Sequence, residues 1–308
     1  MNIPFDTPIL LIIFNRPEIT TKTWGEIKKI KPKILYIAAD GPRNNNKDDI
    51  INCNKARDII TKNIDWECSL HLLFQKENLG CGLAINTAIS WFFKNESEGI
   101  IIEDDCQPHI DFFNFCSELL KRYRYNEEIF MISGKNVSSD YAPKKNSDYS
   151  FTYTPSVWGW ATWRRSWDKY DFYLNDLENF KTQKNIQSIY KKTKYQKYWL
   201  DFFQEIKDKK INNWDYQLTF TSFKNKGLCI RPKYNLVTNL GITIANGGNK
   251  LVFHENGLKI VNHPSTIVAD ELADEIIMKT LITSTYKVKM ILKKLKIFYF
   301  FKKIYKKL

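Results

Sequence analysis

The sequence predicts an α/β protein with a mostly parallel, doubly wound β-sheet. Short apolar runs rich in β-branched residues alternate with stretches of helical periodicity through the first half of the 308-residue chain, as in successive βαβ units. Hydrophobic residues make up 43% of the sequence and aromatic residues 15%, enough for a large core. Because such crossovers are right-handed, we expect helices on both faces of the sheet.

Five short apolar runs bounded by turn residues are predicted to be buried strands: residues 9–14, 34–38, 69–74, 99–102 and 129–133. Four stretches with helical spacing lie between or after them: residues 17–30, 48–62, 83–94 and 110–123. The first of these helices begins at Pro17, a residue suited to a first turn because its missing N–H would be unpaired there anyway.

The pattern changes after Gly134, where a polar, turn-rich stretch precedes a cluster of tryptophans. Two more helices and two short strands are predicted in this half: residues 194–209, 214–223, 227–231 and 235–237. There is no internal repeat and no long low-complexity linker, so we expect the second half to extend the same sheet. The chain is accordingly divided into residues 1–136, 137–275 and a tail of residues 276–308.

The formal charge of +13 belongs mainly to the tail. Residues 285–308 contain nine lysines and no acidic residue, so the rest of the chain has 38 basic and 34 acidic residues, a net charge of +4. We therefore expect no nucleic-acid partner for the body. The tail lysines are interleaved with Ile, Leu, Phe and Tyr, which predicts a basic amphipathic helix on an anionic membrane surface. A nucleic-acid-binding segment and a solvated or oligomerising helix are the alternatives.

The six cysteines show neither a CxxC pair nor zinc-finger spacing. Most lie in or beside apolar runs, so free thiols in a reducing cytoplasm are expected. The first apolar run, residues 8–14, is too short for a signal peptide or a membrane span. These features predict a cytoplasmic protein.

Three adjacent acids, Glu103, Asp104 and Asp105, directly follow the predicted strand 99–102. Open α/β sheets bind ligands at the carboxyl ends of their strands, and adjacent carboxylates repel one another unless a cation or a donor-rich ligand lies beside them. Hard oxygen ligands at such a place suit Mg²⁺ or Mn²⁺, especially an ion shared with a diphosphate. The alternative is a solvated acidic turn that caps the next helix.

Other polar residues follow neighbouring strands and are expected at the same edge of the sheet. Arg16 can pair with a phosphate or stack on a base, and Asp40 can accept hydrogen bonds from a ribose. Asn78 and Gly80 precede the third helix, where the backbone can approach a ligand closely. Neither a P-loop nor GxGxxG is present. Each residue alone is compatible with an ordinary loop, but together they outline a nucleotide pocket.

The order of these motifs resembles that of nucleotide-sugar-dependent glycosyltransferases of the GT-A fold. The motifs are Asn15-Arg16-Pro17, Ala39-Asp40-Gly41, Glu77-Asn78-Leu79-Gly80 and Glu103-Asp104-Asp105. Three later segments are similar to those of N-acetylglucosaminyltransferase I and its bacterial relatives: Gly159-Trp160, Trp214-Asp215 and Cys229-Ile230-Arg231-Pro232. The resemblance spans roughly residues 8 to 241.

The resemblance implies a role for each matching acid of the first half. Asp105 would bind the divalent metal, Mn²⁺ or Mg²⁺, that bridges the donor diphosphate. Glu103 and Asp104 would hold the donor's sugar or ribose. Asp40 and Arg16 would be nucleotide-binding positions. No spacing supports a further metal ligand among the late histidines.

The resemblance also implies that Asp215 lies in the segment that holds the general base of an inverting enzyme. The family has two adjacent acids there, whereas Tyr216 follows Asp215 in this chain. The alternative for Asp215 is a helix N-terminal acid that complements the helix dipole. Trp158 and Trp160 flank a glycine, and their indoles could stack on a sugar ring at an acceptor wall; ordinary aromatic core is the alternative.

These features together predict an inverting, metal-dependent glycosyltransferase of bacterial surface polysaccharide synthesis, such as lipopolysaccharide, peripherally attached to the inner membrane. It would move a sugar from a UDP-sugar to a glycan or lipid-linked acceptor, and the UDP preference rests only on the resemblance. Residues 1–136 would bind the donor, residues 137–275 the acceptor, and residues 276–308 the membrane. The alternatives are a sugar nucleotidyltransferase, whose Gly-rich basic signature is missing after the first strand, and a non-catalytic glycan-binding protein.

Overall fold

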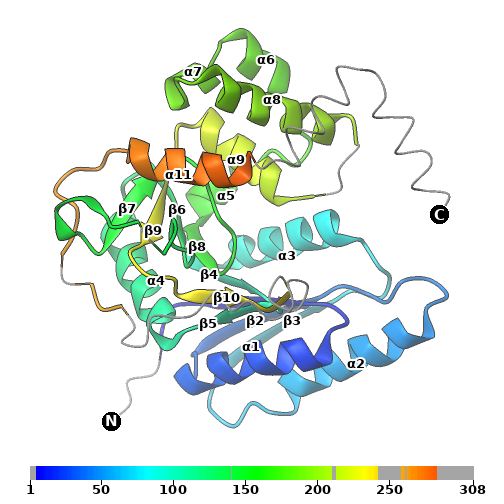
Figure 1. The fold of residues 1–308 in the computed structure, drawn as a ribbon. Helices are drawn as coiled ribbons and strands as arrows, with labels where there is room; N and C mark the ends of the chain where they lie inside the picture. Colours follow the sequence, from blue (N-terminus) through cyan, green and yellow to red (C-terminus); the bar gives the residue numbers. More distant parts are fainter. Residues whose placement is uncertain (1–4, 140, 210–212, 242–257, 261, 283–308) are drawn as a thin grey trace.

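The computed structural model describes residues 5–139, 141–209, 213–241, 258–260 and 262–282, and its centre is an eight-stranded sheet (Figure 1). The strands of the described chain are β1 (Ile9–Ile13), β2 (Ile34–Ala39), β3 (Ser69–Phe74), β4 (Glu98–Glu103), β5 (Cys106–Pro108), β6 (Ile129–Ser133), β7 (Tyr149–Thr152), β8 (Trp160–Trp163), β9 (Leu228–Pro232) and β10 (Val237–Asn239). The sheet order is β3-β2-β1-β4-β8-β6-β9-β7, and only β8 and β7 run against the other six strands. The predicted α/β class with a mostly parallel sheet is confirmed.

The longer helices are α1 (Pro17–Ile30), α2 (Lys47–Thr61), α3 (Cys81–Asn95), α4 (Ile110–Tyr123), α8 (Thr193–Lys207), α9 (Asp215–Lys224) and α11 (Glu271–Leu281), and the short ones are α5 (Arg164–Trp167), α6 (Leu177–Thr182) and α7 (Ile186–Ile189). Every helix and strand predicted from the sequence is present, with ends within two residues of those expected. The strands β5, β7 and β8 and the helices α5, α6, α7 and α11 were not predicted. These are mostly short elements, in which few residues are available to show a periodicity.

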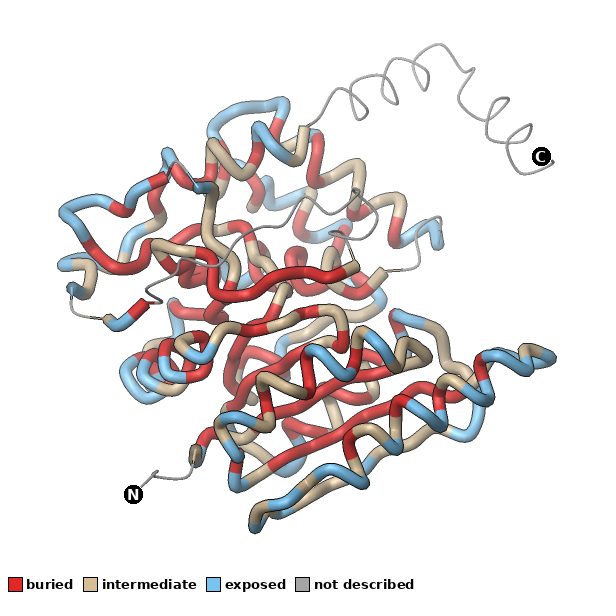
Figure 2. The backbone as a smooth tube through the Cα atoms, turned by 60° about the horizontal axis from the view of Figure 1, so that its bottom comes forward, coloured by how far each residue is buried: buried red, intermediate tan, exposed pale blue. Residues whose placement is uncertain are grey.

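The sheet is doubly wound because alternate residues of its strands enter two separate cores. In β1, Ile9, Leu11 and Ile13 pack with α1, α2 and α4, whereas Leu10 and Ile12 pack with α3 on the other face. Both faces are therefore covered, and the central strands are buried along their length (Figure 2). This explains why the sequences of β1 and β4 are continuous apolar runs and do not alternate between apolar and polar residues.

The second half joins the same sheet through β8, which lies antiparallel between β4 and β6. A third core lies away from the sheet, between α6, α8, α9 and α11 (Figure 1). It is built largely from aromatic side chains, among them Phe180, Phe203 and Phe220. Helix α9 starts at Asp215, directly after Trp214, whose indole stacks on Trp160 of β8.

The predicted membrane-associating tail lies almost wholly outside the described residues, which end at Ile282. Within the described part, no helix has both the length and the apolar character needed to cross a membrane.

Candidate active site

Three strand ends meet at one edge of the sheet because of the parallel register. Ile13 lies opposite Ala39 in β2, and Ile12 lies opposite Glu103 in β4. The loops that follow β1, β2 and β4 therefore leave the sheet side by side, as expected for the ligand-binding edge of an open α/β sheet.

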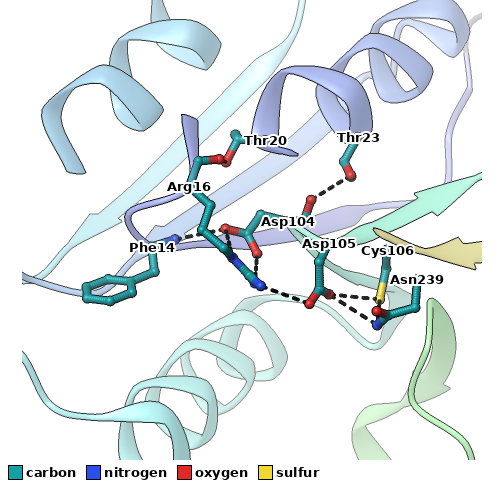
Figure 3. A network of polar contacts seen from close by, with 8 residues as sticks. All are labelled: Phe14, Arg16, Thr20, Thr23, Asp104, Asp105, Cys106 and Asn239. Atoms are coloured by element: carbon teal, nitrogen blue, oxygen red, sulfur yellow. Dashed lines mark hydrogen bonds and ion pairs between the residues drawn. The ribbon is translucent and has the colours of Figure 1, made fainter. Parts of the chain in front are cut away.

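Arg16 forms the centre of the network at this edge (Figure 3). Its guanidinium forms an ion pair with Asp104 through Nη2 and lies 3.0 Å from Asp105 Oδ2 through Nη1. Burial alone would lower the pKa of Arg16, but the two carboxylates raise it above its ordinary value. Asp104 is only 2% exposed, and the Phe14 N–H also donates to its Oδ2 at 3.4 Å. Arg16 and Asp104 thus form a fixed pair before any ligand binds.

Asp105 is the more accessible of the two paired acids, with 19% of its side chain exposed. Among the described residues its Oδ1 has long contacts, 3.5 Å to Asn239 Nδ2 and 3.5 Å to Cys106 Sγ. Its carbonyl oxygen accepts a 2.7 Å hydrogen bond from the Leu240 N–H just after β10, which holds the residue in place.

The chemistry of Asp105 fits one oxygen ligand of a divalent ion, because Mg²⁺ and Mn²⁺ in such sites take most of their other ligands from phosphates and water. No cluster of three or more His, Cys, Asp or Glu side chains in the described ranges could enclose a metal ion. A metal at Asp105 would therefore depend on a phosphorylated ligand for the rest of its coordination.

Glu103 lies on the other side of the same acidic cluster. Burial, together with the nearby carboxylates of Asp105, Asp104 and Asp215, raises the pKa of Glu103 to about 8. A bound cation or hydrogen-bond donor would favour the charged form of this side chain.

Asp40 organises the loop before α3. Its Oδ1 accepts hydrogen bonds from the N–H groups of Gly41 and Leu79, both at 2.9 Å. Its Oδ2 accepts from Asn78 Nδ2 at 2.9 Å and from the Gly80 N–H at 3.2 Å. These four protein donors occupy the carboxylate, so Asp40 fixes the position of this loop, and its contact with a nucleotide stays a prediction.

Close packing explains the glycine after Asp40. A Cβ on Gly41 would lie 2.4 Å from the carbonyl carbon of Glu77, a backbone atom that has no room to move. Gly80 has φ +76°, a conformation that favours glycine, and forms the N-terminal boundary of α3.

A cavity of about 290 Å³, which we name the rim pocket, opens between these loops. Six residues predicted to bind the donor line it: Arg16, Asp40, Asn78, Gly80, Glu103 and Asp104. Cys81 and Ala84 also line it, so the positive N-terminal end of α3 borders the cavity. The structure thus brings together predicted residues that are up to 88 positions apart in the chain, as Arg16 and Asp104 are.

Three further residues contribute to this pocket although the sequence assigned no role to them. Phe14 and Arg43 line it, with the guanidinium carbon of Arg43 5.8 Å from the centre of the Phe14 ring. Asp49 links the loops that follow β1 and β2. It accepts hydrogen bonds from Asn15 Nδ2 at 2.6 Å and from Arg43 Nε at 2.6 Å. Asp49 is 2% exposed, and Arg43 holds its pKa well below the ordinary range. In the sequence it is simply an acid in the first turn of α2, so no pattern distinguished it.

A second cavity, of about 210 Å³, lies at the carboxyl end of β6 and is named the β6 pocket. Its lining includes Lys135, Trp158, Asp215 and Arg231. The Oδ1 atom of Asp215 is buried and has no hydrogen-bond partner among the described residues. Burial raises the pKa of Asp215.

The prediction that Trp160 contacts a sugar is wrong. Trp160 is 1% exposed because β8 is inserted between β4 and β6. Its indole stacks on Trp214, with ring centres 6.0 Å apart, directly before Asp215. Trp160 is therefore a core residue that supports the start of α9, whereas Trp158 does line the β6 pocket.

The chain shows only distant similarity to known proteins. No protein-family model matches it, and no curated protein does. Among solved structures, UDP-glucose pyrophosphorylase complexed with UDP-glucose has 10% identity and a TM-score of 0.41, covering 76% of this chain and 94% of that one. Mouse xyloside xylosyltransferase 1 in its apo form has 11% identity and a TM-score of 0.35, covering 70% of this chain and 81% of that one. Similarity at this level does not identify the activity of this chain.

Proposed function

We propose that this protein is an inverting glycosyltransferase that moves a sugar from a UDP-sugar to a hydroxyl group of a glycan or lipid-linked acceptor. The observation that carries the proposal is Asp215, a buried carboxylate in the lining of the β6 pocket whose Oδ1 has no hydrogen-bond partner among the described residues. Such an oxygen is available to accept a proton from a bound hydroxyl group, and a raised pKa makes it a better base.

In the proposed reaction, the acceptor oxygen bonds to the anomeric carbon of the donor sugar while the bond from that carbon to the diphosphate oxygen breaks. The bonding electrons leave with the nucleoside diphosphate, and the hydroxyl proton passes to the Asp215 carboxylate. A single displacement inverts the anomeric configuration, whereas a carboxylate nucleophile would give retention in two steps. Asp215 is the single acid among the described residues that line the β6 pocket, which favours inversion.

The rim pocket would hold the donor. Phe14 and Arg43 offer a flat wall for a base, and Arg16 offers a fixed positive charge for a phosphate. Asp105 would hold a Mn²⁺ or Mg²⁺ ion together with the diphosphate, and such an ion would neutralise the charge that develops on the leaving group.

The proposal also covers the acceptor and the cellular location of the enzyme. We assign the enzyme to bacterial surface polysaccharide synthesis at the cytoplasmic face of the inner membrane, with the lysine-rich tail at residues 276–308 as its contact with anionic lipid. This part rests on the sequence of the tail and on the resemblance to the glycosyltransferase family.

Thermal-shift measurements with nucleotide sugars test the donor site. We expect a UDP-sugar to raise the melting temperature, and to do so more strongly with Mn²⁺ present, because ligand binding to the folded state stabilises it. A response to CMP- or GDP-sugars alone would overturn the choice of donor. Absence of any response to nucleotide sugars would overturn the function.

Replacing Asp215 by Asn tests the base. Transfer should fall by about 10² to 10⁴-fold, as expected for the loss of a general base, while UDP-sugar binding remains. The matched control is Asp48→Asn, an exposed acid in the first turn of α2, which should transfer normally. Unchanged transfer by Asp215→Asn would reject the mechanism, and release of pyrophosphate from UTP and a sugar 1-phosphate would point to a nucleotidyltransferase.

A further inference from the structure

The β6 pocket contains the ammonium group of Lys135, which forms no ion pair with any residue that the structure describes. Lys135 follows β6 directly and is partly buried. Its Nζ lies 3.8 Å from the centre of the Trp158 ring. An ammonium held over an indole retains N–H donors that point away from the ring, and no described residue accepts a hydrogen bond from them.

A second cation lies beneath Lys135. Arg231 is 3% exposed, and its guanidinium donates to neutral acceptors: the carbonyl oxygens of Thr154 at 2.7 Å, Pro155 at 3.1 Å and Lys135 at 3.4 Å. It therefore fixes the backbone of Lys135 and adds positive potential below it. Burial, with the charge of Arg231, lowers the pKa of Lys135 to about 8.

The nearby acids do not neutralise Lys135. Asp274, which offsets part of the Arg231 charge, accepts hydrogen bonds from the Tyr153 N–H at 2.9 Å and from Thr154 Oγ1 at 2.9 Å. Asp215 lines the same pocket but forms no ion pair with Lys135. Burying a charge without a partner is unfavourable, so the pocket is arranged for an anion that the described residues do not supply.

We propose that the β6 pocket is an acceptor subsite that recognises an anionic group, a carboxylate or a phosphate, on the acceptor sugar, with Lys135 as the cation that binds it. This inference rests on the proposed function, because it takes the β6 pocket as the place of the acceptor. It makes the acceptor an acidic or phosphorylated sugar, and it explains why Lys135 and the base Asp215 occupy one pocket without pairing.

Binding of matched sugar pairs tests the inference independently of transfer. Methyl glucuronide is compared with methyl glucoside, and glucose 6-phosphate with glucose, by calorimetric or NMR titration in the presence of saturating UDP and Mn²⁺. We expect at least one anionic member to bind about tenfold more tightly than its neutral partner, a difference typical of one charge-assisted hydrogen bond. The pair that shows the difference tells whether the anion is a carboxylate or a phosphate.

Two lysine variants test whether Lys135 causes the preference for the anionic sugar. Lys135→Met should abolish the tenfold preference for the anionic sugar. The matched control is Lys194→Met, because Lys194 is an exposed lysine that also lies over an aromatic ring, 5.0 Å from the centre of Tyr195. This control should keep the preference, and the melting temperature of both variants verifies their folding.

Three results would overturn the inference: no preference for either anionic sugar in the unmodified protein, a preference that survives in Lys135→Met, or a tenfold loss of UDP affinity in Lys135→Met, which would place the lysine at the donor. Failure of the proposed function would look different. UDP and UDP-sugars would then fail to bind the unmodified protein at all, whatever the sugar titrations show.

Discussion

The two pockets of this protein differ in how their charges are satisfied. In the rim pocket the protein pairs Arg16 with two aspartates and Asp40 with four donors, and Glu103 is the exception, a buried acid beside other carboxylates. In the β6 pocket, Asp215 has an oxygen without a partner and Lys135 has no counter-ion among the described residues. Paired charges make a rigid surface to which a ligand can bind without reorganisation. Unpaired charges leave groups that can accept a proton or bind an anion.

The largest loss of stability is expected at Asp40, one of the paired charges of the rim pocket. Asp40→Ala removes the acceptor of three backbone N–H groups and one amide, and we expect unfolding free energy to fall by about 3 kcal/mol, since each buried donor left unsatisfied is costly. Denaturant unfolding measures this. Asp48→Ala, at an exposed acid, is the control, and a loss below about 1 kcal/mol at Asp40 would contradict a positioning role.

A smaller effect is expected at Trp160, which supports the β6 pocket from the core. Trp160→Phe keeps an apolar ring but loses part of the contact with Trp214, and should cost about 1.5 kcal/mol. Because Asp215 follows Trp214, we also expect transfer to slow while UDP-sugar affinity is unchanged. If the rate is unaffected in a variant shown to be destabilised, Trp160 does not position the base.

Asp49 and Asp215 have pKa shifts in opposite directions. Replacing each of them gives the sharpest test of the difference between paired and unpaired charges. Asp49 is paired with Arg43, which holds its pKa below the ordinary value of 3.8. Such a carboxylate stabilises the folded state above pH 3.8, and this contribution is lost as the pH falls through the lower folded-state pKa. Asp49→Asn should therefore lower the unfolding free energy by about 1 kcal/mol at pH 7, and the difference should shrink below pH 3.8. A difference constant with pH would mean that the charge of Asp49 is unimportant.

The smallest effect, with the opposite sign, is expected at Asp215. Burial raises its pKa above 3.8, so the folded protein binds the proton more tightly than the unfolded chain does, and stability falls as the pH rises from 3.8 through the folded-state pKa. Asp215→Asn should therefore gain about 1 kcal/mol or less at pH 7, and this gain should disappear near pH 4. Urea unfolding at several pH values shows it. Destabilisation at pH 7 would indicate that Asp215 is a paired structural acid after all.

The same comparison explains what could be inferred about the site before the structure was known. The rim residues lie directly after strands with strong apolar signals, so their approximate place followed from the alternation of elements. Their individual roles did not follow. Asp40 finds its partners in Asn78, Leu79 and Gly80, 38 to 40 positions later, and such a contact leaves no trace in local spacing. Asp49 was missed for the same reason, since its partners lie on two other loops.

The α/β class, the ends of the main helices and strands, and the edge of the sheet where acids gather could be predicted from the amino-acid order, because hydrophobic periodicity is a local property. The pairing of charges depends on the folded arrangement. The insertion of β8 between β4 and β6 buried Trp160 and made it a support for α9. In the folded chain, no described residue gives Asp215 Oδ1 a hydrogen bond or Lys135 Nζ an opposite charge. Pairing depends on distances between segments far apart in the chain, and these distances exist only once the chain has folded.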